Sequence, residues 1–319
     1  MIPHHAIATL RAVGRGFVPR RPLVLAVLAA LALAPAARAE VRVVTTTEGL
    51  ASLAREVGGD RVSVESLSRG VQDPHFVDPN PTLALRLRQA DLLVDVGLDL
   101  EIGWLPPLVN QSRNAEIQPN GRRRLTAASA VGVLEIPTGP VDRSQGDLHP
   151  AGNPHFLTDP RRALAVAQAI AARLARLDPA GAASYQANLT AFSRRLAEAE
   201  RRWAMELAPV KGRKLMTHHR TMTYFLDWSG IGLAGVLEPK PGVPPPPSHL
   251  ADMVGVARRE GVKAMVVENY YDPKSDELVS RLSGAKLVVI PGDVGGVPEA
   301  KDYLHYVGDL VRLVSQALR

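Results

Sequence analysis

Two short segments of the sequence place a histidine directly after a proline and before a phenylalanine. His75 lies in the segment DPHF (73–76), and His155 lies in the segment NPHF (153–156). Because proline fixes its own φ and restricts the residue before it, the backbone that carries each imidazole is stiff. A stiff ligand loses little freedom when a metal binds. One such segment alone would fit a capping or surface histidine, whereas two copies favour a metal site.

Further candidate ligands follow predicted strands. His218 and His219 come directly after the strand predicted at 214–217, and Asp293 follows the one predicted at 286–290. In an open parallel sheet, ligands collect beyond the carboxyl ends of the strands. Only one of two adjacent histidines can face a common site, because successive side chains diverge in extended chain. Asp293 lies in a glycine-rich segment, so it would also suit a plain turn.

Glu268 and a short loop add weaker candidates. Glu268 ends the strand predicted at 264–268, where it could orient a histidine through its free ring nitrogen or be a solvated strand end. The loop at 142–149 contains Asp142, Asp147 and His149. These three side chains could form a weak capture site for a metal, or they could be solvated loop residues.

The elements that must position these residues alternate between short apolar strands and amphipathic helices. We predict strands at 41–47, 61–67 and 91–96, and later at 214–217, 232–236, 264–268 and 286–290. We predict helices at 222–229, 249–260, 275–283 and 303–318, and shorter ones after the first two strands. This alternation is typical of α/β lobes with parallel sheets.

A helical stretch without strand signals separates the two alternating regions. Asp159-Pro160 and Asp178-Pro179 each supply an N-cap and a first-turn proline. The second helix, predicted at 179–207, would be ~43 Å long, which is more than one lobe needs. We therefore predict an N-terminal lobe (40–177), a connecting helix (178–208) and a C-terminal lobe (209–319).

The first 39 residues have the pattern of a secretory signal peptide. Arg20 and Arg21 precede a 12-residue apolar run (23–34), and an A-x-A site follows at 37–39. Twelve residues of helix rise only ~18 Å, too short for a membrane core of ~30 Å. We predict cleavage after Ala39, by the general or the twin-arginine route, and a soluble mature chain in the periplasm.

Composition excludes several classes of protein. The chain has 319 residues, of which 46% are hydrophobic and 22% charged, so it is expected to fold, as two domains. The net charge of +6 comes from the leader, because the remainder has 33 basic and 32 acidic side chains. A remainder with almost no net charge and an aromatic share of 4% for the whole chain do not indicate a nucleic-acid partner. The absence of cysteine excludes disulfides, thiolate metal sites and a lipid-anchored cysteine.

Five segments, in this order, resemble the zinc-binding solute-binding proteins of ABC importers. They are DPHFVDPNP, GNPHFLTDP, THHRTMTYF, EPKPGVPPPPSHL and the pair VVENYYDP and PGDVGG. The resemblance is to the metal-specific cluster A-I, or TroA-like, family, and is closest to members of the AztC type. It covers nearly the whole chain after the leader.

The resemblance implies two α/β lobes bridged by one long helix, with a metal between the lobes. It assigns the ligands to His75, His155, His219 and Asp293, with His219 rather than His218 matching the third histidine. It implies that the protein is not an enzyme, and that its partners are an ABC permease and its ATPase. A periplasmic metallochaperone is a further possible partner, and we expect a monomer.

The donor set favours Zn²⁺ as the transported ion. Three imidazoles and one carboxylate suit a four-coordinate borderline cation, whereas manganese prefers sites richer in oxygen. Manganese-carrying members of the family have a glutamate where His219 stands. Many zinc members also carry a long loop rich in histidine and acidic residues before the NPH segment, and here that loop is short (142–149).

Two other functions remain possible from the sequence. A secreted zinc hydrolase would need an open coordination position and a general base, and no H-E-x-x-H helix is present. An adhesin or interaction module could use the same fold without a metal. High-affinity capture of Zn²⁺ and its delivery to a permease is the function that the residues favour.

Overall fold

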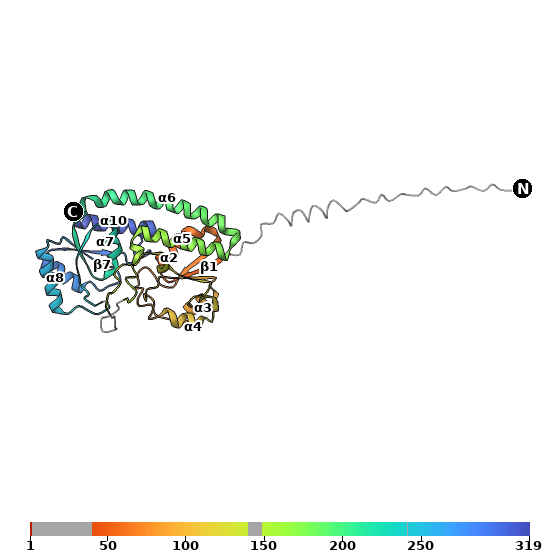
Figure 1. Ribbon diagram of the computed structural model, residues 1–319, viewed down its shortest axis with the longest axis horizontal. Helices are drawn as coiled ribbons and strands as arrows, with labels where there is room; N and C mark the ends of the chain where they lie inside the picture. Colours follow the sequence, from red (N-terminus) through yellow and green to blue (C-terminus); the bar gives the residue numbers. More distant parts are fainter. Residues whose placement is uncertain (2–39, 140–148, 241) are drawn as a thin grey trace. The chain divides into compact units, whose positions relative to one another are not determined.

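The computed structural model describes Met1 and residues 40–139, 149–240 and 242–319. All the helices and strands that it describes belong to one compact unit, Glu40–Arg319 (Figure 1). The predicted leader, its cleavage site after Ala39, and the loop residues Asp142 and Asp147 lie outside the described residues.

The N-terminal lobe is built on a parallel four-stranded sheet in the order β2-β1-β3-β4. Its strands are β1 (Val41–Thr45), β2 (Val62–Ser66), β3 (Leu92–Asp95) and β4 (Arg124–Thr126). Its helices are α2 (Glu48–Gly58), α3 (Pro81–Gln89), α4 (Leu105–Ser112) and α5 (Pro160–Leu177). Every residue of β3 is buried, as expected for a parallel strand covered on both faces.

The C-terminal lobe repeats this plan with a parallel sheet in the order β6-β5-β7-β8. Its strands are β5 (Lys214–Thr217), β6 (Gly232–Val236), β7 (Ala264–Glu268) and β8 (Lys286–Ile290). Its helices are α7 (Thr223–Ser229), α8 (Pro247–Arg259), α9 (Lys274–Ser283) and α10 (Tyr303–Leu318). The prediction of two α/β lobes with parallel sheets is confirmed.

The long helix α6 (Ala182–Leu207) packs against elements of both lobes (Figure 1). It contacts α2 and α5 of the N-terminal lobe and α10 of the C-terminal lobe. It begins after a 3-10 turn at Pro179–Gly181, in which the Asp178 carboxylate accepts the Gly181 N–H at 3.2 Å. The predicted bridging helix is therefore confirmed, while the exact boundaries of the three predicted domains remain predictions.

One cluster of buried apolar side chains extends through both lobes. It includes Val43 of β1, Val266 of β7, and Phe192 and Trp203 of α6. Full burial of one such large apolar side chain contributes about 2–3 kcal/mol. Because the lobes share this core, they cannot separate without exposing it to water.

Candidate metal centre

Four imidazole rings gather between the two lobes. The ring centroid of His75 lies 5.2 Å from that of His155, 5.3 Å from that of His149 and 5.4 Å from that of His219. The rings of His155 and His219 are 5.3 Å apart. Ring nitrogens of His75, His149 and His155 all lie within 4.8 Å of one another. The cluster combines loops that follow strands of different sheets.

The two X-Pro-His segments form the same local turn. The Asp73 carboxylate accepts the backbone N–H of His75 at 2.9 Å, and the Asn153 side-chain oxygen accepts that of His155 at 2.9 Å. A side chain that accepts an N–H two residues further along is an Asx turn. With the intervening proline, this turn presents each imidazole from stiff backbone, as the sequence predicted. The Trp104 indole N–H also donates to the Pro74 carbonyl at 2.9 Å.

The adjacent histidines after β5 face different surroundings. The His219 ring lies beside those of His75 and His155, whereas the His218 ring lies against Tyr271, with centroids 4.5 Å apart. His218 Nδ1 lies 2.8 Å from the Asp276 carboxylate. The geometry therefore agrees with the choice of His219 over His218, and metal ligation by His219 stays a prediction.

Two carboxylates orient rings of the cluster. His75 Nδ1 lies 2.7 Å from Asp73 Oδ1, and His219 Nδ1 lies 2.9 Å from Glu238 Oε2. Such a carboxylate fixes the imidazole tautomer and leaves Nε2 for a metal. Sequence reasoning did not single out either acid. The signal was present for Asp73, which stands two residues before His75, and weaker for Glu238, which opens the EPKP segment after β6.

Burial favours the neutral form of three of the clustered imidazoles, those of His149, His155 and His219. It lowers the pKa of His149 to about 3, aided by the neighbouring His75 and His219. The pKa of His155 is well below its usual range for the same reasons, and burial also lowers the pKa of His219. A neutral imidazole is the form that ligates a metal. The Nε2 atom of His155 is buried without a hydrogen-bond partner in the described chain, as expected of a donor reserved for a metal.

His218 instead carries a positive charge in the wall of the site. Burial opposes this charge, but a hydrogen bond with Asp276 and an ion pair with Glu238 raise the pKa of His218 to about 10. Glu238 is likewise buried, and its bonds to His218 and His219 lower its pKa to about 2. The charged His218 thus balances the carboxylate that orients His219.

Asp293 lies close to the cluster with its carboxylate already engaged. Its Oδ2 accepts the Gly49 N–H at 3.0 Å, and its Oδ1 accepts the Val294 N–H at 2.8 Å. Burial raises the pKa of Asp293 to about 6, although these two amides oppose the rise. Asp293 and His155 line the same small cavity of about 50 Å³. The described ring nitrogens that come together as a possible metal site are those of His75, His149 and His155, and this group includes neither His219 nor Asp293.

The weaker candidates have different outcomes. Glu268 is 1% exposed, so its alternative as a solvated strand end is wrong. Neither of its carboxylate oxygens has a hydrogen-bond partner in the part of the chain that the structure describes, so it orients no imidazole directly. Burial raises the pKa of Glu268 to about 7. His149 does join the cluster, with its Nε2 3.3 Å from that of His75, while Asp147 and Asp142 lie outside the described residues.

The fold and the imidazole cluster together define a metal-binding solute-binding protein. The sequence model of the family described as "ZnuA: Zinc-uptake complex component A periplasmic" matches residues 43–317. The chain therefore belongs to this family of metal-binding substrate-binding proteins of ABC transporters, and the predicted family is confirmed. The closer resemblance to the AztC type stays a prediction.

Curated relatives and solved structures agree with this assignment. The manganese ABC transporter substrate-binding lipoprotein PsaA of Streptococcus pneumoniae is 26% identical over 247 residues, covering 76% of each chain. The metal ABC transporter substrate-binding lipoprotein ScbA of Streptococcus cristatus has the same identity and coverage. A crystal structure of ZnuA superposes with a TM-score of 0.72 at 22% identity, covering 88% of this chain and 100% of that one. A Mn-bound periplasmic metal-binding protein from Candidatus Liberibacter asiaticus gives 0.73 at 17% identity, with the same coverage.

These relatives are substrate-binding proteins, and the chain, like them, is not an enzyme. The names of the relatives include both zinc and manganese. Membership of the family therefore establishes a metal-binding protein of an ABC transporter and leaves the choice of metal to the chemistry of the donor atoms.

Proposed function

We propose that this protein captures Zn²⁺ in the periplasm and delivers it to an ABC permease driven by its ATPase. The observation that carries the proposal is the cluster of four imidazoles between the lobes, two of them oriented by carboxylates. Nitrogen-rich donor sets suit zinc, whereas manganese prefers carboxylate and carbonyl oxygens. A periplasmic metallochaperone as donor of the ion, and a monomeric state, belong to the same proposal.

The proposed ligands are His75, His155, His219 and Asp293, which would complete a tetrahedron. His149 competes with Asp293 for the fourth position, because its Nε2 already lies 3.3 Å from that of His75. Asp293, by contrast, already accepts the amide N–H of Gly49 at 3.0 Å. We infer that His149 makes the first contact with the ion and that Asp293 replaces it in the final complex.

Export supports the same function. Residues 1–39 carry the pattern of a signal peptide, and the chain contains no cysteine that could be lipidated. In the part of the chain that the structure describes, no helix has the length and apolar character needed to cross a bilayer. We propose that the protein, unlike the relatives named as lipoproteins, is free in the periplasm.

Native mass spectrometry and a competing zinc indicator test the proposal. We expect one Zn²⁺ per chain, with zinc preferred over Mn²⁺ in direct competition. His155→Ala should remove tight binding, because His155 is central to the cluster and its Nε2 has no other partner. The control is His305→Ala on α10, a half-exposed histidine bonded to Asp302.

The two candidates for the fourth ligand are separated by Asp293→Asn and His149→Ala. We expect Asp293→Asn to lower the zinc affinity strongly and His149→Ala to slow zinc capture with little change in affinity. A larger loss of affinity in His149→Ala would assign the fourth position to His149. Preference for Mn²⁺, or equal binding by His155→Ala and His305→Ala, would contradict the proposed function.

A further inference from the structure

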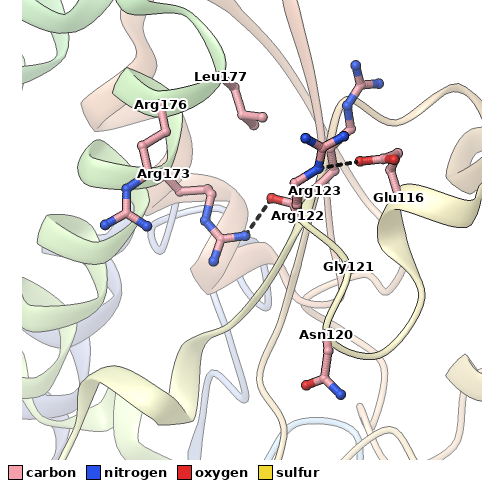
Figure 2. Close-up of a pocket in the computed structure, with 8 residues that line it drawn as sticks. All are labelled: Glu116, Asn120, Gly121, Arg122, Arg123, Arg173, Arg176 and Leu177. Carbon is pink, nitrogen blue, oxygen red and sulfur yellow. Dashed lines mark hydrogen bonds and ion pairs between the residues drawn. The ribbon is translucent and has the colours of Figure 1, made fainter.

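A pocket lined by arginines lies in the N-terminal lobe, and the metal centre does not use it. It has a volume of about 740 Å³. Two arginines of α5 stand on one side and two that precede β4 on the other, with one acid beside them (Figure 2). These charged residues are Arg122, Arg123, Arg173, Arg176 and Glu116.

The pocket and the metal centre lie at opposite ends of the same sheet. Arg122 and Arg123 enter β4 at its amino end, whereas His75 follows the carboxyl end of β2. All strands of this sheet are parallel, so their amino ends share one edge and their carboxyl ends the other. An occupant of the pocket would therefore not touch the imidazole cluster.

One of the four arginines is held in place by backbone contacts. Arg173 reaches across from α5 and donates to the carbonyl oxygen of Arg122 at 2.8 Å and to that of Arg124. The loop opposite is tightly folded, because a Cβ at Gly121 would meet the Glu116 carbonyl oxygen at 2.1 Å. Arg173 is thus fixed between α5 and the loop that carries Arg122, and the other arginines stand around the same pocket (Figure 2).

The positive charge of the pocket is only partly compensated. Glu116 pairs with Arg122 at 3.3 Å. Arg123 lies 3.3 Å from Asp91, but Asp91 also pairs with Arg42. Arg176 is exposed and has no hydrogen-bond or ion-pair partner in the described chain, and together with burial it lowers the pKa of Arg173.

Stabilisation of the C-terminal end of α5 by positive charge explains only some of the arginines around the pocket. Cations in the last turn of a helix interact favourably with its dipole, and Arg173 and Arg176 both lie near that end. This effect requires neither the arginines of the facing loop nor an open volume between them. Guanidinium groups that converge on a cavity match the oxygens of phosphate and carboxylate groups in bidentate pairs.

We propose that this pocket binds a small multivalent oxyanion, carrying two or more phosphate or carboxylate groups. The volume lies within the range of small-molecule sites and far exceeds that of a single water or phosphate. Of the four guanidinium groups in the lining, those of Arg173 and Arg176 have no carboxylate partner in the described chain, which favours an occupant with more than one negative charge. The site is independent of the proposed zinc function.

Isothermal titration calorimetry on the metal-free protein at low ionic strength tests the proposal. Inorganic pyrophosphate is the phosphate probe and citrate the carboxylate probe; metal-free protein is used because both chelate zinc. Arg176→Glu reverses a charge that has no hydrogen-bond or ion-pair partner in the described chain, and Arg201→Glu on α6 makes the same change at an exposed position outside the pocket. Zinc titration of both variants checks that each is folded and has kept its metal centre.

We expect one anion per chain, bound about tenfold or more weakly by Arg176→Glu and almost unchanged by Arg201→Glu. The stronger of the two probes identifies the class of anion. No binding of either probe, or equal losses in the two variants, would overturn the proposal. Zinc binding has no bearing on this result, so failure of the anion site and failure of the zinc function are distinguishable.

Discussion

At the scale of single residues, the metal centre depends on acids that would not themselves touch the ion. Asp73 holds both the backbone N–H and the ring Nδ1 of His75. Glu238 holds Nδ1 of His219 and is itself balanced by the charged His218. Each imidazole is thereby presented in one tautomer and one orientation.

Removal of Asp73 should weaken zinc binding without removing a ligand. We expect Asp73→Ala to lower the zinc affinity about 10- to 100-fold, because the His75 ring loses its orienting partner. A competing indicator measures the change. The control, Asp78→Ala, removes an exposed aspartate of the same loop and should change the affinity less than about twofold. Equal effects of the two substitutions would show that Asp73 does not orient His75.

The dependence of zinc binding on pH should follow the protonation of Asp293 more than the protonation of the imidazoles. Burial raises the pKa of Asp293 to about 6, and a protonated carboxyl must lose its proton before it ligates. The pKa values of His149, His155 and His219 are lowered, so these rings stay neutral to lower pH. Zinc affinity should therefore fall as the pH drops through about 6.

Asp293→Asn provides the comparison for this pH dependence. We expect the variant to bind zinc more weakly at pH 7.5 but to lose less of its remaining affinity between pH 7 and pH 5, values chosen on either side of about 6. Zinc titrations across this interval measure both slopes. If zinc affinity fell equally steeply with pH in the two proteins, the proton that weakens binding would belong to another ligand.

The sequence allowed the histidines to be found because their neighbours have local consequences. The prolines before His75 and His155 predict stiff turns from chain chemistry alone. The partners of His218 could not be found in this way, because Asp276 lies 58 residues further along the chain. The burial of Glu268 could not be predicted from the sequence either, since a glutamate at a strand end is usually solvated.

At the scale of elements, the strands that were easiest to predict are those with continuous apolar runs. β5, β6, β7 and β8 begin and end at the predicted residues. β4 was not predicted, because its three residues contain a single apolar side chain, Leu125, between Arg124 and Thr126. α4 was also missed, since two adjacent prolines, Pro106 and Pro107, lie in its first turn.

The loop that carries His155 is fastened to α7 by Tyr224. The Tyr224 hydroxyl donates to the Asn153 carbonyl at 2.6 Å and accepts the Leu134 N–H at 3.0 Å. The Asn153 side chain in turn donates to the Arg220 carbonyl at 2.9 Å. One phenol thus joins two strand-connecting segments next to the metal centre.

Tyr224→Phe should loosen this fastening while it preserves the packed ring. We expect a loss of about 1–3 kcal/mol in the free energy of unfolding of the metal-free protein, because a buried N–H and a carbonyl lose their partner. Denaturant unfolding measures the loss. Tyr306→Phe is the matched control, since its hydroxyl makes only a 3.4 Å contact with the Gly292 carbonyl. A loss no greater than that of the control would contradict this role of Tyr224.

At the scale of the whole molecule, several contacts tie the lobes together besides the shared core. The Tyr303 N–H donates to the Ser52 hydroxyl at 2.9 Å, and the Tyr303 hydroxyl donates to the Leu157 carbonyl at 2.8 Å. A Cβ at Gly70 would lie 2.0 Å from the carbonyl oxygen of Val294, so these loops approach too closely for any side chain at that position. Local movements of His149 and Asp293 are therefore less costly than separation of the lobes.

The bond between Asp293 and Gly49 joins residues 244 positions apart and sets up a competition within the molecule. The first turn of α2 offers the carboxylate an N–H and the positive end of a helix dipole. If Asp293 ligates the ion as proposed, we expect the ion to compete with this N–H for the carboxylate, which would lower its apparent affinity. The Gly49 N–H would bind the carboxylate again when the ion departs, and this would favour release of the ion.

A substitution at Gly49 can alter the competition between the α2 N–H and the ion for the Asp293 carboxylate. A Cβ at position 49 would lie 2.7 Å from Asp293 Oδ1, while the helical backbone there accepts alanine readily. We expect Gly49→Ala to displace the carboxylate, tighten zinc binding about tenfold and slow zinc release to a chelator in stopped-flow experiments. An unchanged rate of release would mean that the helix does not compete. With alanine at position 49, the protein would hold zinc more firmly and deliver it more slowly.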